Sequence, residues 1–180
     1  MTVLFTADTH FGDPRVLRID RRPYASIPEH DEALVANWNG AVAEGDEVWH
    51  LGDFALGIGA ERIDQLLGRL HGRKHLIQGN NDGAATLAAA GWASVQHYAE
   101  LVVEGTRVVL CHYAFRTWNG MGRGAWNLHG HSHGRLKRAT RQADVGVDAQ
   151  GYRPVTLAAI VAGRSRPGAG RTPGAPSGQT

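Results

Sequence analysis

The amino-acid sequence predicts an α/β protein with mixed β-sheets. Short apolar runs alternate with helical patterns in the first half of the chain, and four strand-like runs follow one another in the second half. Alternation of strands and helices is typical of parallel sheets, and consecutive strands add antiparallel pairs. A single chain that shows both patterns therefore favours sheets of mixed direction.

Residue periodicity predicts the elements of the first half. Apolar runs of four or five residues suit buried strands, and apolar residues repeated every three or four positions suit helices packed on one face. Leu34, Val35 and Trp38 lie on the inner face of one such helix, and Leu66, Leu67 and Leu70 on that of another. The predicted order is strand 3–7, helix 29–43, strand 48–51, helix 60–70, strand 75–78 and helix 83–90.

Strands dominate the second half. A tight turn over 103–107 joins predicted strands 100–103 and 107–111, and further strands are predicted over 126–128 and 144–147. Residues 164–180 are rich in Gly, Pro, Ser and Thr without an apolar period, so a disordered tail is predicted there. Residues 1–163 are expected to form one domain, because a chain of this size can bury a stable core.

Composition indicates a soluble globular protein of the cytoplasm. The chain is 42% hydrophobic and 20% charged. Its single cysteine, Cys111, excludes an internal disulfide framework and suits a reducing compartment. The first apolar run meets Asp8 too early for a signal peptide, and no run approaches the roughly 18 apolar residues of a membrane span. We therefore expect a cytoplasmic protein without membrane partners.

The net charge of +2 does not indicate a nucleic-acid binder. Three arginines and no acidic residues lie in 164–180, and the rest of the chain has 16 basic against 17 acidic residues. Proteins that bind duplex nucleic acid usually concentrate positive charge on one face. The composition therefore argues against nucleic acid as a partner. A nuclease that acts on single strands is kept as an alternative. The oligomeric state cannot be read from the sequence.

Seven side chains that can bind metal follow the predicted strands in five short clusters. In open α/β sheets, ligands bind beyond the carboxyl ends of the strands, so these clusters are expected to converge on one crevice. Seven ligands suit two metal ions that share a ligand better than one tetrahedral site. The candidates are Asp8, His10, Asp53, Asn80, His112, His131 and His133.

The donor atoms favour a particular group of metals. Carboxylate and amide oxygens together with imidazole nitrogens suit Mn²⁺, Fe, Zn²⁺ or Co²⁺ better than Ca²⁺. A carboxylate between two ions can bind both, and Asp53 is the natural candidate for that position. If the run 130–133 is extended, His131 and His133 face the same side, and Gly130 and Ser132 let the backbone come close to the ions.

These five clusters resemble the signature of the calcineurin-like metallophosphoesterases, in the order of that family and over residues 8–133. The resemblance implies a four-layer fold, with two mixed β-sheets packed face to face and helices outside. It also implies how the ligands divide between the ions. Asp8, His10 and His133 would hold the first metal; Asn80, His112 and His131 would hold the second; Asp53 would bridge them.

One position departs from the family pattern. Many members carry a histidine between the asparagine and the acidic residue, and this histidine is usually assigned to protonating the leaving oxygen or steadying the phosphate. This chain has Asn81 there, and an amide can donate a hydrogen bond but not a proton. Asn81 and Asp82 are the candidate catalytic residues, with the alternative that Asp82 is only the N-cap of a helix beginning near Gly83.

The expected reaction is hydrolysis of a phosphate ester, either a monoester or a diester. Two cations would neutralise the phosphate and lower the pKa of a bridging water, whose hydroxide then attacks phosphorus. The alternatives are a non-catalytic metal-binding scaffold of the same fold and a nuclease that acts on single strands. Arg22, on the arginine-rich loop after the first ligand pair, is the candidate for binding phosphate.

The expected substrate is a small phosphorylated molecule such as a nucleotide. Four aromatic residues near the predicted crevice are candidates for stacking on a base, with burial in the core as the alternative. They are Phe11, Tyr24, Trp118 and Trp126.

Overall fold

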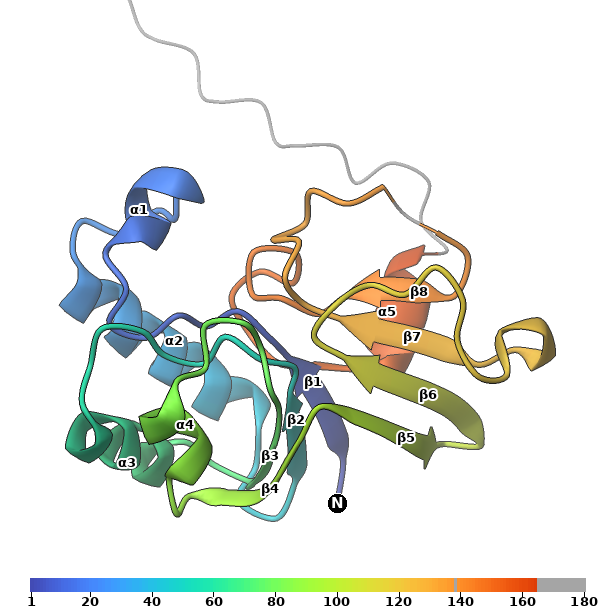
Figure 1. Cartoon of the computed structure of the whole chain (residues 1–180), viewed down its shortest axis with the longest axis horizontal. Coiled ribbons are helices and arrows are strands. Elements are labelled where there is room, and N and C mark those ends of the chain that lie inside the picture. The colour runs from blue at the N-terminus through green and yellow to red at the C-terminus, as the bar shows by residue number, and fades with distance from the viewer. Residues whose placement is uncertain (138, 165–180) are drawn as a thin grey trace, which may run out of the picture.

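The computed structural model describes residues 1–137 and 139–164 of the chain. Two mixed β-sheets flanked by helices form the molecule, which confirms the predicted fold class (Figure 1). The tail predicted over 164–180 lies outside the described residues, except for Arg164, which ends helix α5 (Leu157–Arg164).

The first sheet has five strands in the order β4-β3-β2-β1-β9. The strands β1 to β4 run parallel, and β9 is antiparallel to β1. Parallel direction places the carboxyl ends of β1, β2 and β3 at the same edge. The bounds are β1 (Val3–Thr6), β2 (Glu47–His50), β3 (Arg73–Ile77), β4 (Trp92–Gln96) and β9 (Val155–Thr156).

The second sheet has four strands in the order β5-β6-β7-β8. An antiparallel hairpin joins β5 to β6, whereas β6, β7 and β8 are parallel. The carboxyl ends of β6 and β7 therefore also share an edge. The bounds are β5 (Tyr98–Val103), β6 (Thr106–Cys111), β7 (Trp126–His129) and β8 (Gln142–Asp144).

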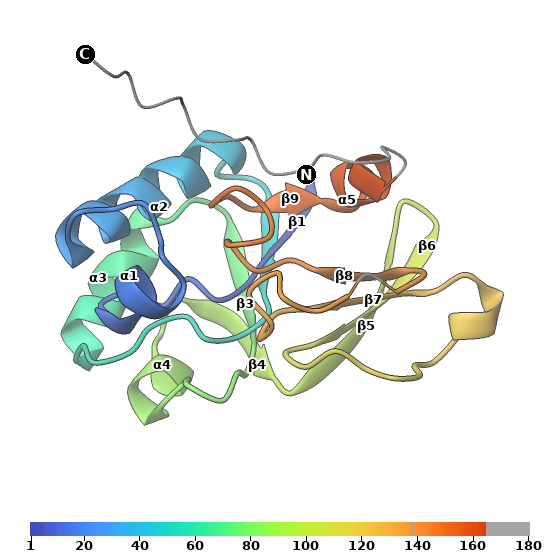
Figure 2. The same ribbon diagram turned by 90° about the horizontal axis from the view of Figure 1, so that it is seen from above.

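Two hydrophobic cores hold the layers together. One lies between the first sheet and the helices α2 (Ile27–Ala41) and α3 (Ala60–Arg69), which gather on the side of that sheet away from the second sheet (Figure 2). The other lies between the sheets, where Phe5 and Leu51 meet Leu110 and Leu128. The first sheet therefore packs on the helices through one core and on the second sheet through the other. This packing holds the strand ends of the two sheets in fixed positions relative to one another.

The remaining elements are short. Helices α1 (Arg15–Ile19) and α4 (Ala84–Ala88) and a 3-10 helix (Met121–Arg123) lie in the connections, and α5 packs beside β9 and β1. The sequence pattern does not predict α1, β4, β9 or α5. In β4, three of five residues are exposed, so the strand lacks an apolar run. Within the described part of the chain, none of the helices is both long and apolar enough to cross a membrane.

Candidate metal centre

The structure brings the side chains of all five sequence clusters together at the carboxyl ends of β1, β2, β3, β6 and β7. Two groups of potential ligand atoms form there, and within each group the atoms lie within 4.8 Å of one another. The first group is Asp8, His10 and His133, and the second is Asp53, His112 and His131. The first group is the set that the family resemblance assigns to the first ion, and the second group joins His112 and His131 of the second ion to Asp53, the implied bridge.

Asp53 lies between the two groups. Its Oδ2 is 3.5 Å from His10 Nε2 in the first group and 3.6 Å from His112 Nε2 in the second. Asn80 joins the second group, because its Oδ1 is 3.0 Å from His112 Nε2. One carboxylate thus faces histidines of both groups, as a bridging ligand must.

The backbone is unusual at these residues. Nine non-glycine residues in the described part of the chain have positive φ, and the five at the site are Asp8, His10, Asp53, His131 and His133. Left-handed backbone is uncommon outside glycine and gathers at functional sites, where surrounding contacts enforce it. The expectation of an extended run is therefore wrong: φ is 65° at His131 and 48° at His133, and these side chains join different groups.

Glycines give the site its tight packing. A Cβ on Gly79 would lie 2.3 Å from Asp53 Oδ1, and one on Gly130 would lie 2.9 Å from Asp8 Oδ2. Atoms at those distances would collide, so only glycine fits at either position. The close backbone approach expected for Gly130 is present, toward Asp8.

Buried polar atoms without partners indicate that the first group fits a cation. Asp8 Oδ2 and both ring nitrogens of His10 are buried and have no hydrogen-bond partner among the described residues. Burial raises the pKa of Asp8 well above its ordinary value and lowers the pKa of His10 to about 4. A His10 ring with this lowered pKa is neutral at physiological pH, as metal coordination requires, and a nearby positive charge would favour the ionised form of the buried Asp8 carboxylate.

Further groups orient the histidines. His112 Nδ1 lies 2.8 Å from the carbonyl oxygen of Leu51, which leaves Nε2 directed at Asp53. His133 Nδ1 lies 2.8 Å from Asp148 Oδ2. Partners of this kind fix the ring orientation and tautomer of metal-binding histidines. Asp148 is absent from the site residues predicted from the sequence. A signal for it existed, because Asp148 is a polar residue directly after the predicted strand 144–147.

The structure does not support the expected phosphate-binding role of Arg22. Its side chain is fully buried, and its guanidinium donates to both Asp148 oxygens at 2.9 and 2.7 Å and to the carbonyl oxygens of Thr9 and Asp8. His30 Nε2 lies 2.9 Å from Nη1 as well. Arg22 therefore supports the loop and the histidine partner Asp148 in place of contacting substrate.

Asp82 does not cap a helix, because α4 begins after Gly83 and has no side-chain cap. Its carboxylate accepts hydrogen bonds from the backbone N–H groups of Asp53 at 2.9 Å, Phe54 at 2.9 Å and Gly79 at 2.8 Å. These donors belong to the loops that carry Asp53 and Asn80. Asp82 is thus better described as a positioning residue than as the catalytic residue expected from the sequence.

The side chain of Asn81 turns toward Asp53. Its Nδ2 donates to Asp53 Oδ2 at 2.7 Å, and its backbone N–H donates to Oδ1 at 2.8 Å. Burial by itself raises the pKa of Asp53, but His112 and these hydrogen bonds outweigh that effect and lower it. Asn81 therefore helps to keep the central carboxylate ionised.

Two of the four aromatic candidates for base stacking are core residues. Phe11 is completely buried in the core under α2 and α3, and Trp126 is buried between the sheets. Neither ring has a free face for a base.

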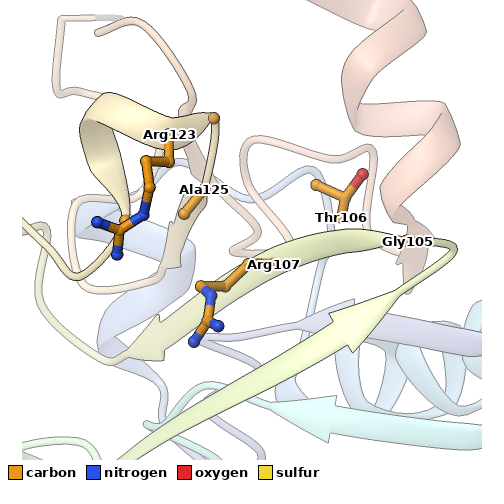
Figure 3. A pocket seen from close by; sticks show the side chains of 7 residues that line it. Gly105, Thr106, Arg107, Arg123 and Ala125 are labelled. Atoms are coloured by element: carbon orange, nitrogen blue, oxygen red, sulfur yellow. The ribbon is translucent and has the colours of Figure 1, made fainter.

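A separate cavity of about 310 Å³ lies at the amino end of β6, whereas His112 follows the carboxyl end of that strand. Arg107 and Arg123 contribute to its lining (Figure 3). Arg107 Nη1 is already paired with Glu100 at 2.7 Å. None of the seven candidate ligands lines this cavity. The candidate metal ligands lie instead at the opposite end of the strands.

Fold and site together define an α/β protein of two mixed sheets with a candidate two-metal centre at its strand ends. The model for the calcineurin-like phosphoesterase superfamily domain matches residues 1–149, and the chain belongs to this superfamily. The family is metal-dependent, in agreement with the two ligand groups.

Relatives of the chain are known from an archaeon and from phages. An uncharacterized protein of Methanocaldococcus jannaschii is 26% identical over 167 residues, which covers 88% of this chain and 89% of that protein. The gene 66 protein of Mycobacterium phage D29 is 33% identical over 178 residues, with coverage of 82% and 88%.

Solved structures share the fold. A protein of unknown function from Aquifex aeolicus superposes with a TM-score of 0.70 at 19% identity, over 89% of this chain and 97% of that one. The Escherichia coli phosphoesterase Yfce superposes with a TM-score of 0.50 at 13% identity, over 81% and 78%. At these identities the likeness concerns the fold alone.

Proposed function

We propose that this protein is a dinuclear metal-dependent hydrolase of phosphate esters, with a small phosphorylated molecule as its substrate. The observation that carries the proposal is the pair of ligand groups joined by Asp53, in a chain that belongs to a phosphoesterase superfamily. Mn²⁺, Fe and Zn²⁺ suit the mixed oxygen and nitrogen donors. When bound, such ions would neutralise phosphate oxygens and make water acidic enough to supply hydroxide near neutral pH.

The seven candidate ligands would divide between the two ions. Asp8, His10 and His133 would hold one ion, Asn80, His112 and His131 the other, and Asp53 both. Leu51 and Asp148 orient two of the histidines through their second ring nitrogen. Asp82 keeps the Asp53 and Asn80 loops in register. The role of the side chains is therefore to fix positions and charge.

Metal removal and reloading test the proposal. Protein stripped with EDTA should not release p-nitrophenol from p-nitrophenyl phosphate or from bis(p-nitrophenyl) phosphate, and Mn²⁺ should restore activity on at least one of them. The ratio of the two rates decides between monoester and diester. Protein that holds two ions by elemental analysis and hydrolyses neither ester would contradict the proposal and favour a non-catalytic scaffold.

Asn81→His is expected to raise turnover most on esters with poor leaving groups. A histidine there can donate a proton to the leaving oxygen, and general acid assistance is worth about 10²-fold at its low end. The measurement compares kcat for phenyl phosphate and p-nitrophenyl phosphate. Asn81→Gln has no transferable proton and should show no such dependence on the leaving group. An equal gain of Asn81→His on both esters would contradict this account.

A further inference from the structure

Tyr113 lies against the second ligand group. It directly follows His112 at the end of β6, and its ring centroid is 5.0 Å from that of His112 and 4.7 Å from that of His131. Its hydroxyl lies 3.4 Å from Asn80 Oδ1. One phenol therefore touches three candidate ligands of the same metal.

The ring is not part of a core. Its exposed fraction is 47%, whereas its neighbour His112 is almost completely buried. The contact of the hydroxyl with Asn80 is at the long limit of hydrogen bonds, so the hydroxyl is loosely held and can exchange this partner for a better one. Tyr113 is thus a half-exposed residue with a weakly held hydroxyl directly beside the ligands.

Three other protic side chains of the loops that carry the ligands already have partners. The Asn81 amide donates to Asp53, Arg22 is buried on Asp148, and Arg15 binds the Asp13 carboxylate through both Nε and Nη2. Tyr113 combines contact with the ligand group, exposure and a weakly held hydroxyl.

The geometry points to Tyr113 as a substrate-binding residue whose hydroxyl donates a hydrogen bond to a nonbridging oxygen of the bound phosphoryl group. This inference rests on the proposed function, because it takes the phosphate to lie on the two ligand groups. Hydrogen bonds from a hydroxyl to an anionic oxygen are short and about twice as strong as neutral ones. A tyrosine hydroxyl would also supply part of the phosphate contact for which the sequence suggested Arg22.

Tyr113→Phe tests the inference, since it removes only the hydroxyl. The Mn²⁺-loaded variant should bind inorganic phosphate roughly 10-fold more weakly in a calorimetric titration, the usual effect of losing one hydrogen bond to a charged group. Its kcat/KM on p-nitrophenyl and phenyl phosphate should fall by a similar factor for both. Metal content and the thermal midpoint should stay at the wild-type values.

Tyr98→Phe is the matched control. Tyr98 is 41% exposed on β5, and its hydroxyl donates to Glu100 at 2.6 Å, so its loss should change neither phosphate binding nor kcat/KM. Wild-type phosphate binding in Tyr113→Phe would overturn the inference while hydrolysis by the wild-type protein upholds the proposed function. A loss confined to phenyl phosphate would also overturn it, because it would place the hydroxyl on the leaving group. Wild-type protein that neither binds phosphate nor hydrolyses esters would overturn both.

Discussion

Asp53→Asn is expected to lower kcat/KM for phosphate ester hydrolysis by about 10³-fold. Loss of the charge stabilisation that one metal provides costs several kcal/mol, and each step of about 1.4 kcal/mol is a factor of ten in rate. Asp53 Oδ2 faces His10 Nε2 and His112 Nε2 at nearly equal distances, 3.5 and 3.6 Å. An amide brings no negative charge and offers one oxygen. The metal content measured by elemental analysis should therefore fall below two ions.

Asp64→Asn makes the same chemical change at an exposed position of α3 and is the matched control. It should leave both the metal content and kcat/KM within experimental error of wild type. Asp53→Asn with wild-type kcat/KM and two bound ions would place the reaction elsewhere on the molecule. A variant that keeps two ions but loses activity would assign Asp53 a role in charge balance without metal bridging.

The strand-end rule explains why the site could be predicted from sequence. Asp8, Asn80 and His131 each stand two or three residues beyond a strand, and parallel pairing within each sheet puts the carboxyl ends of its paired strands at one edge. Apolar runs identify such strands without knowledge of their pairing. The two-sheet arrangement and the division of ligands followed from the family resemblance, since periodicity carries no information about which sheet a strand joins.

Other features of the site depend on contacts that sequence position does not reveal. Arg21 and Arg22 are adjacent, yet Arg21 is exposed and Arg22 is buried against Asp148, which lies 126 residues away. Asp82 faces backbone N–H groups of a loop 28 or 29 residues earlier. The left-handed backbone at His131 and His133 is likewise enforced by packing, because a local pattern of small and polar residues permits extended structure equally well.

Arg22→Met is expected to lower the free energy of unfolding by about 3–5 kcal/mol, the range for breaking a buried ion pair by removing one partner. Burial raises the pKa of Asp148, but hydrogen bonds from His133 and Arg22 lower it to about 2, and the substitution would remove one of these two partners. The carbonyl oxygens of Asp8 and Thr9 would lose their donor. Because Asp148 also orients His133, metal affinity should fall by about 10- to 100-fold.

Chemical denaturation and metal titration measure these two effects, with Arg21→Met as the matched control. An exposed side chain such as Arg21 should change the unfolding free energy by no more than about 0.5 kcal/mol. At saturating metal, the KM of Arg22→Met should stay near wild type, because the guanidinium has no exposed surface with which to hold substrate. Unchanged stability together with a raised KM would restore the phosphate-binding role suggested by the sequence. Arg22→Lys keeps the charge but not the planar fork, so its loss of stability should lie between those of Arg21→Met and Arg22→Met.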